Sequence, residues 1–101
     1  VFLNVVEFGM NPQQAVEAPR VATFSMPSSF WPHAYYPGQS SAEARIDPKV
    51  IDELRSRGHK VEVWDEWTGR VGNVCAIVVD RDRGILEGAA DPRREAYAMG
   101  R

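Results

Sequence analysis

Two serines and a histidine, Ser28, Ser29 and His33, lie close together in one segment of this 101-residue chain. A serine nucleophile needs a base within hydrogen-bond reach and a third group that orients the base. No G-x-S-x-G sequence surrounds these serines, and serine is common in proline-rich loops for turn formation alone. The sequence therefore favours a role in loop formation over catalysis for this group.

Four carboxylates, those of Asp65, Glu66, Asp80 and Asp82, form a second candidate group. All four fall at predicted turns, where aspartate side chains commonly accept hydrogen bonds from nearby backbone amides. We interpret them as solvated turn residues and not as a pair of acid–base catalysts.

The single cysteine, Cys75, lies in the apolar run 74–79. We expect it to behave as a small buried apolar residue. One cysteine excludes a disulfide within the chain, and no CxxC or histidine-rich spacing typical of a metal site is present. We therefore expect no catalytic residue, no metal ligand and no cofactor-binding residue in these 101 residues.

The third group is Asp91-Pro92-Arg93-Arg94, which follows the small residues 88–90. Proline stiffens the chain directly after the predicted last strand, so the arginines could be directed at a carboxylate or at backbone carbonyls. The same residues could equally form a solvated charged tail. Composition alone leaves both interpretations open.

Residues 27–41 are rich in proline, serine and aromatic side chains and predict a long loop. Its four aromatic residues could stack on a ligand or on a partner, or could pack against another part of the protein. We favour packing against another chain segment. The aromatic residues are Phe30, Trp31, Tyr35 and Tyr36, grouped around His33.

The composition is that of an ordinary globular protein, with 44% hydrophobic and 26% charged residues. Twelve basic residues are scattered among 14 acidic ones, which argues against a nucleic-acid-binding surface. The apolar N-terminal run is too short to span a membrane and lacks the basic region of a signal peptide. The sequence leaves the compartment undetermined.

Local signals predict an α/β (α+β) chain. Asn11-Pro12 and Asp47-Pro48 each combine a helix cap with proline in the first turn, and residues 60–64 alternate like a half-buried strand. The run 73–79 predicts a central strand buried on both faces. The predicted helices span 1–8, 12–18 and 48–57, and the predicted strands span 21–26, 42–46, 60–64, 73–79 and 85–88.

The helix predicted over residues 1–8 is apolar nearly all round, and such helices are normally buried on several sides. We therefore expect the chain to be one end of a larger protein, produced by truncation or cleavage.

Several phrases together resemble the γ-glutamyltransferase family of N-terminal-nucleophile hydrolases. The first is residues 3–20, which contain Gly-Met-Asn-Pro-Gln-Gln-Ala-Val-Glu-Ala-Pro-Arg, and the last is residues 88–94, Gly-Ala-Ala-Asp-Pro-Arg-Arg. Shorter matches lie at residues 54–61 and 72–77. The matched segments follow the family's order and cover about two thirds of the chain.

The resemblance implies that residues 1–101 are the C-terminal part of a small subunit, a single domain or fragment within a four-layer αββα sandwich of mostly antiparallel sheet and covering helices. In this family the precursor cleaves itself, and the freed N-terminal threonine attacks a γ-glutamyl amide. That threonine, the oxyanion-hole glycines and the substrate-binding serines are expected upstream of this chain. Ser28-Ser29 falls in the wrong order to be that serine pair.

The expected partners are the remainder of the same precursor, namely the large subunit and the N-terminal part of the small subunit, with a γ-glutamyl or related amide as substrate. We expect the chain alone to be inactive and to self-associate. Candidates for structural or subunit contacts are Arg20, Asp91, Arg93 and Arg94. Two alternatives stay open: a related acylase, such as a cephalosporin-type enzyme, and a standalone binding module that uses the aromatic loop.

Overall fold

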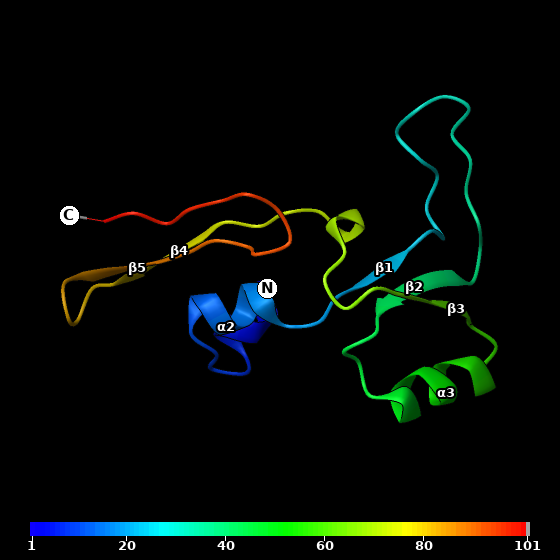
Figure 1. Ribbon diagram of the computed structural model, residues 1–101, viewed down its shortest axis with the longest axis horizontal. Helices are drawn as coiled ribbons and strands as arrows, with labels where there is room; N and C mark the ends of the chain where they lie inside the picture. The colour runs from blue at the N-terminus through cyan, green and yellow to red at the C-terminus, as the bar shows by residue number, and fades with distance from the viewer. Residues whose placement is uncertain (101) are drawn as a thin grey trace. The chain divides into compact units, whose positions relative to one another are not determined.

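The computed structural model describes residues 1–100, which fold as two compact units. One unit consists of Val1–Ala18 together with the segment from Gly72 onward, and the other is Pro19–Val71. Helices and strands occur in both units (Figure 1). None of the helices in residues 1–100 is long and apolar enough to cross a lipid bilayer.

The unit Pro19–Val71 is built on a three-stranded sheet with strand order β1-β2-β3. Strands β1 and β2 are antiparallel, whereas β2 and β3 are parallel and are joined through helix α3. A short 3₁₀ helix follows the sheet. The elements are β1 (Val21–Thr23), β2 (Gln39–Glu43), α3 (Pro48–Ser56), β3 (Lys60–Trp64) and the 3₁₀ helix η1 (Gly69–Val71).

Helix α3 begins at the predicted cap, because the Asp47 side chain accepts a hydrogen bond from the Lys49 backbone N–H at 2.9 Å. It ends before Gly58, whose φ of 91° is the left-handed conformation that glycine adopts without strain. The helix packs its apolar stripe on the sheet. The core of this unit comprises Ala42, Ile51 and Val61, with Ile46 and Leu54 packed against them.

The second unit combines two short helices with a β-hairpin. The Asn11 side chain accepts a hydrogen bond from the Gln14 backbone at 2.8 Å, and Gln14 returns one to the Asn11 backbone at 3.2 Å, so the second helix has a complete capping box. The elements are α1 (Phe2–Val6), α2 (Pro12–Glu17), β4 (Ala76–Asp80) and β5 (Ile85–Ala89), the two strands being antiparallel.

Helix α2 covers one face of this hairpin. Ala15, Val16 and Ala89 are almost completely buried and form the centre of the contact. The hairpin turn is closed by Asp80, whose carboxylate accepts a hydrogen bond from the Arg83 backbone N–H at 2.9 Å. A small core of this kind, with helices on one side only, leaves most of the other face of the hairpin exposed within residues 1–100, where only the segment after β5 lies beside it.

Most predicted elements are present, with shifted ends. Strand β2 spans Gln39–Glu43, whereas the sequence predicted a loop to residue 41 and a strand over 42–46. The polar residues at its start are held in the sheet by pairing with both β1 and β3. Because strand formation depends more on pairing than on intrinsic preference, composition assigned these residues wrongly to the loop.

The prediction of a central strand buried on both faces is wrong for this structure. Strand β4 belongs to a two-stranded hairpin, and Ile77 and Val79 are 73% and 60% exposed. Cys75, expected to be buried, is exposed as well. Alternate residues of a strand point to opposite faces, and these three share the face opposite the one formed by Ala76 and Val78.

The N-terminal helix is shorter than the predicted range 1–8. Regular α-helix ends at Val6, and the Leu3 carbonyl then accepts hydrogen bonds from both Glu7 and Phe8. Gly9 follows with a φ of 65°, consistent with the predicted helix stop. None of the residues of α1 is buried within the described chain.

Candidate functional site

The unit Pro19–Val71 contains a completely buried carboxylate, that of Glu43 at the end of β2. Its Oε2 accepts a hydrogen bond from the Arg20 backbone N–H at 3.0 Å, and its Oε1 accepts one from the Thr68 backbone N–H at 3.2 Å. A buried carboxylate is stable only when its oxygens are hydrogen-bonded and its charge is compensated. Glu43 thus joins the segment before β1 to the segment after β3.

Arg45 supplies the compensating charge. Its Nη2 lies 3.2 Å from Glu43 Oε2, and its Nε donates to the Glu66 carbonyl at 2.9 Å. The guanidinium also stacks 3.5 Å above the ring centre of Trp67, a cation–π contact. The planar guanidinium therefore holds the turn after β3 through two contacts and connects it to Glu43 of β2 through a third.

The other unit has a corresponding carboxylate, that of Asp91, directly after β5. Its Oδ2 accepts a hydrogen bond from the Val74 backbone N–H at 3.2 Å, and its Oδ1 accepts one from the Arg93 backbone N–H at 3.1 Å. The Asp91 side chain is fully buried. The acidic residue therefore holds the segment before β4 and the turn after β5 together.

Arg93 is the charge partner of Asp91. Its Nη1 donates to Asp91 Oδ1 at 3.1 Å and to the Val16 carbonyl at 2.8 Å, while its Nη2 donates to the Ala18 carbonyl at 2.9 Å. Both charged side chains are completely buried. Arg93 thereby satisfies two carbonyls at the end of α2, which have no partner within the helix.

A third contact connects α2 to the segment after β5. The Gln13 side chain donates to the Ala90 carbonyl at 3.1 Å and accepts from the Ala90 backbone N–H at 3.2 Å. One amide side chain therefore satisfies both backbone groups of a single residue. This arrangement holds the C-terminal end of the hairpin against the helix.

The four candidate residues from the sequence thus occupy different environments. Asp91 and Arg93 form the buried pair described above. Arg20 is partly buried and lies in the other unit, where its backbone N–H and carbonyl both contact Glu43. Arg94 is exposed. The interpretation of the 91–94 segment as a wholly solvated tail is wrong, because Asp91 and Arg93 are buried.

The serine and histidine group does not have the geometry of a nucleophile and its base. His33 Nδ1 lies 2.9 Å from the backbone carbonyl of Ser28, and the Ser28 hydroxyl accepts a hydrogen bond from the Phe30 backbone N–H at 3.2 Å. A catalytic pair would instead bring the imidazole to the hydroxyl. These contacts support the predicted role in loop formation.

The acidic turn residues are also separate from one another. Asp80 binds the hairpin turn, and Asp65, Glu66 and Asp82 are exposed. Among residues 1–100, no three histidine, cysteine, aspartate or glutamate side chains are grouped so that they could hold a metal ion.

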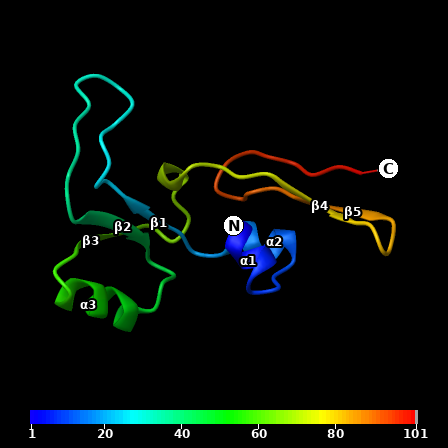
Figure 2. The ribbon, with the colours of Figure 1, turned by 180° about the vertical axis from the view of Figure 1, so that it is seen from behind.

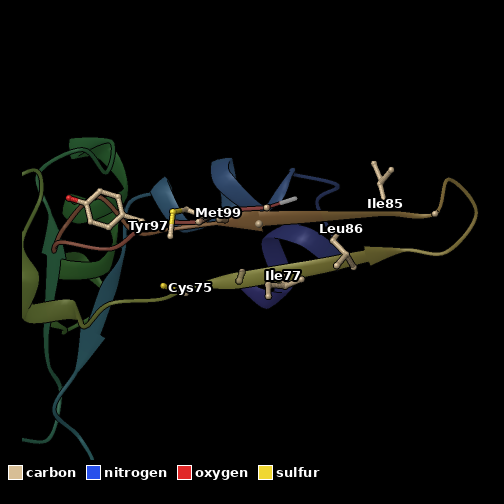
Figure 3. Close-up of a pocket in the computed structure, with 12 residues that line it drawn as sticks. Cys75, Ile77, Ile85, Leu86, Tyr97 and Met99 are labelled. Atoms are coloured by element: carbon tan, nitrogen blue, oxygen red, sulfur yellow. The ribbon is translucent and has the colours of Figure 1, made fainter.

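An apolar hollow of about 720 Å³ lies along the uncovered face of the hairpin. Figure 3 shows Cys75, Ile77 and Leu86 along the strands, and Tyr97 and Met99 on the segment that follows β5. The hollow contains no charged side chain, so it has the character of an uncovered packing surface and not of a catalytic cleft.

Sequence reasoning did not identify Glu43, Gln13 or Thr68. Glu43 is the first charged residue after a long uncharged stretch that begins at Val21, which is a signal that it terminates a buried or apolar segment. No local pattern indicates that Gln13 contacts a residue 77 positions away.

Comparison with known proteins identifies the family. The family model for gamma-glutamyltranspeptidase matches residues 1–101. A glutathione hydrolase-like YwrD proenzyme from Bacillus subtilis (strain 168) is 34% identical over 100 residues, which cover 99% of this chain and 18% of the relative. The chain belongs to the gamma-glutamyltranspeptidase family. The resemblance inferred from the Gly-Met-Asn-Pro and Asp-Pro-Arg-Arg phrases is confirmed.

Two solved structures are similar to this chain. The structure of LmbA2991T421A is 42% identical with a TM-score of 0.88, and the match covers 99% of this chain and 18% of that one. The cephalosporin acylase from Bacillus halodurans is 29% identical with a TM-score of 0.73, covering 91% and 15%. These neighbours confirm the predicted α+β class and the N-terminal-nucleophile hydrolase fold, and the family is enzymatic.

Proposed function

We propose that these residues form the C-terminal part of the small subunit of a gamma-glutamyltranspeptidase-like amidohydrolase. The observation that supports the proposal most strongly is the family match over the whole chain, combined with a relative of which the chain spans 18%. The rest of the precursor, comprising the large subunit and the beginning of the small subunit, would complete the enzyme.

In this proposal the chemistry belongs to an N-terminal threonine that precedes these residues in the small subunit. Its hydroxyl attacks the carbonyl of a γ-glutamyl amide, and its own α-amine accepts the proton. The carbon–nitrogen bond breaks, the amine leaves with that proton, and the acyl group stays on the threonine as an ester. Water or the amine of an amino acid then takes the acyl group and restores the hydroxyl.

In this proposal, residues 1–101 stabilise the fold of the small subunit. The pair Asp91–Arg93 fixes α2 against the hairpin, and Glu43 with Arg45 fixes the sheet of the other unit. We infer a structural role for Arg20 as well, through its backbone, and a subunit contact for the exposed Arg94.

The test is expression of the complete reading frame that contains these residues. We expect a precursor that cleaves itself into two chains, of which the one containing residues 1–101 begins with threonine by N-terminal sequencing. The mature enzyme should release p-nitroaniline from γ-glutamyl p-nitroanilide, and replacing that threonine with alanine should abolish both cleavage and turnover. Undiminished anilide turnover by an uncleaved precursor would contradict the proposal.

An acylase acting on other amides is the second candidate, favoured by the similarity to a cephalosporin acylase. The ratio of kcat/KM for the γ-glutamyl anilide to that for a glutaryl-cephalosporin distinguishes the two. A ratio above one supports the transpeptidase-like assignment, and a ratio below one supports the acylase.

A further inference from the structure

Residues 24–38, here named the aromatic arm, connect β1 to β2 and carry no charged side chain. No aspartate, glutamate, lysine or arginine occurs anywhere between Arg20 and Glu43, although 26% of the chain is charged. Loops normally run over the protein surface, where charged side chains are common. A loop of this length that lacks charge and exposes several large aromatic side chains is typical of an interaction surface.

The aromatic arm has a defined conformation. Its base is closed by hydrogen bonds from the Phe24 backbone N–H to the Gln39 carbonyl at 3.1 Å and from Tyr36 to the Phe24 carbonyl at 2.7 Å. Nearer the tip, the Ser28 backbone N–H donates to the Ala34 carbonyl at 3.0 Å. Successive cross-links of this kind make the arm an ordered projection and not a flexible tether.

Aromatic packing holds the base of the arm and leaves its tip uncovered. Phe24 contacts Trp64 of β3 edge to face, with ring centres 6.1 Å apart. Phe30 and Trp31 are 81% and 87% exposed, and in Figure 1 and Figure 2 the arm extends away from α3. Other large side chains exposed on the arm are Met26, Tyr35 and Tyr36.

These features match those of interface anchors. Aromatic residues and methionine are enriched at the buried centre of protein interfaces, where charged residues are depleted. Three prolines, at positions 27, 32 and 37, fix φ and so reduce the conformational entropy that docking would cost. Five large apolar side chains also present more surface than a small amide substrate would cover.

We propose that the aromatic arm docks in an uncharged apolar groove of the same precursor, formed by residues outside these 101. The inference rests on the proposed function, because the occupant is the remainder of that precursor. Two observations select this occupant. The chain spans only 18% of its relative, so most of that protein corresponds to residues outside these 101. The exposed aromatic and methionine side chains of the arm fit an apolar surface of comparable size.

The experiment uses the complete enzyme with a photo-crosslinking amino acid, p-benzoylphenylalanine, in place of Trp31. A matched variant carries it in place of Asp52, an exposed residue of α3. On irradiation, the position-31 variant should crosslink to residues of the same molecule outside this segment, identified by mass spectrometry, and the position-52 variant should not. Mixing differently tagged copies distinguishes crosslinks within one molecule from those between copies.

Hydroxyl-radical footprinting of the unaltered enzyme provides a readout that does not depend on any variant folding. Oxidation of Trp31 should be severalfold slower in the native enzyme than in the urea-unfolded enzyme. An unprotected Trp31, a crosslink yield no higher than at position 52, or crosslinks only between copies would each overturn the docking. So would protection of Trp31 that appears only when amide substrate is added, which would make the arm a substrate-binding loop.

Failure of the docking and failure of the proposed function give different results in these experiments. A precursor that cleaves itself and turns over the anilide but leaves Trp31 accessible refutes the docking alone. A protein that neither cleaves nor turns over amides refutes the enzymatic assignment, whereas protection of Trp31 and its crosslinks can still be measured.

Discussion

Replacing Asp91 should loosen the end of the β4–β5 hairpin by an amount that the contacts allow to be estimated. The carboxylate accepts hydrogen bonds from the backbone of Val74 and from both the backbone and the side chain of Arg93. Asp91→Ala leaves the Arg93 guanidinium buried without its counter-charge. Breaking a buried ion pair from one side costs roughly 3–5 kcal/mol, because the remaining charge keeps its desolvation penalty.

The assay is hydrogen exchange of the complete enzyme, followed in a peptide that contains the Val74 amide. A loss of roughly 3–5 kcal/mol corresponds to exchange about 10²- to 4 × 10³-fold faster, since every 1.4 kcal/mol is a factor of about ten. Asp91→Asn should fall between the alanine variant and the original protein. Asparagine keeps one acceptor oxygen, but its NH₂ group then faces either the Val74 N–H or the two Arg93 donors, and neither of these can accept a hydrogen bond from it.

Glu95→Gln serves as the matched control, because Glu95 lies close in sequence but is exposed. Surface changes of this kind usually alter stability by about 0.5 kcal/mol or less. The double variant Asp91→Ala with Arg93→Met should cost less than the sum of the single changes, since coupled neighbours are non-additive by about 0.5–3 kcal/mol. Unchanged exchange in Asp91→Ala, or strict additivity, would refute the reasoning.

Three further predictions concern other contacts of the complete enzyme. Glu43→Ala should accelerate exchange at the Thr68 amide, again by roughly 3–5 kcal/mol of lost local stability, while leaving Val74 unaffected. Asn11→Ala should lower stability by about 1 kcal/mol through loss of the α2 cap, measured as a lower unfolding midpoint in urea, whereas Asn11→Ser should restore most of it. Ile77→Asp should reduce the yield of folded, cleaved enzyme if another layer covers the open hairpin face, and an unaltered yield and midpoint would show that this face remains in water.

Elements with local signals could be predicted from the sequence. The Asn11-Pro12 and Asp47-Pro48 pairs mark the starts of α2 and α3, because a cap satisfies backbone N–H groups only a few residues away. The alternation over residues 60–64 likewise predicted β3 correctly.

Features that depend on distant pairing could not be predicted in this way. The start of β2 depends on pairing with distant residues, since Gln39 lies opposite Lys60 of the parallel β3 and Ser40 lies opposite Thr23 of β1. The polar residues there have little strand preference of their own. The burial of β4 was predicted wrongly. A continuously apolar run indicates that both faces of a strand are suited to burial, but it does not show whether the residues that bury them belong to this chain. Arg93 contacts carbonyls 77 and 75 residues away in the sequence. No local pattern reveals such contacts, so the sequence could not decide between a buried and a solvated Arg93.

The two buried carboxylates follow the same pattern. Each pairs with the arginine two positions later, Glu43 with Arg45 and Asp91 with Arg93.

The chain passes from one unit to the other twice, after Ala18 and after Val71. Each pair binds the backbone near both of these positions, within the unit to which the pair belongs. In one unit Glu43 binds the backbone at residues 20 and 68, and in the other the Asp91–Arg93 pair binds the backbone at residues 18 and 74. An apolar contact would supply similar stability but would tolerate sliding, whereas hydrogen bonds to particular amides fix which residues meet. We therefore expect that replacing both residues of a pair with apolar side chains preserves most of the stability. The connecting segments, however, should lose their defined path.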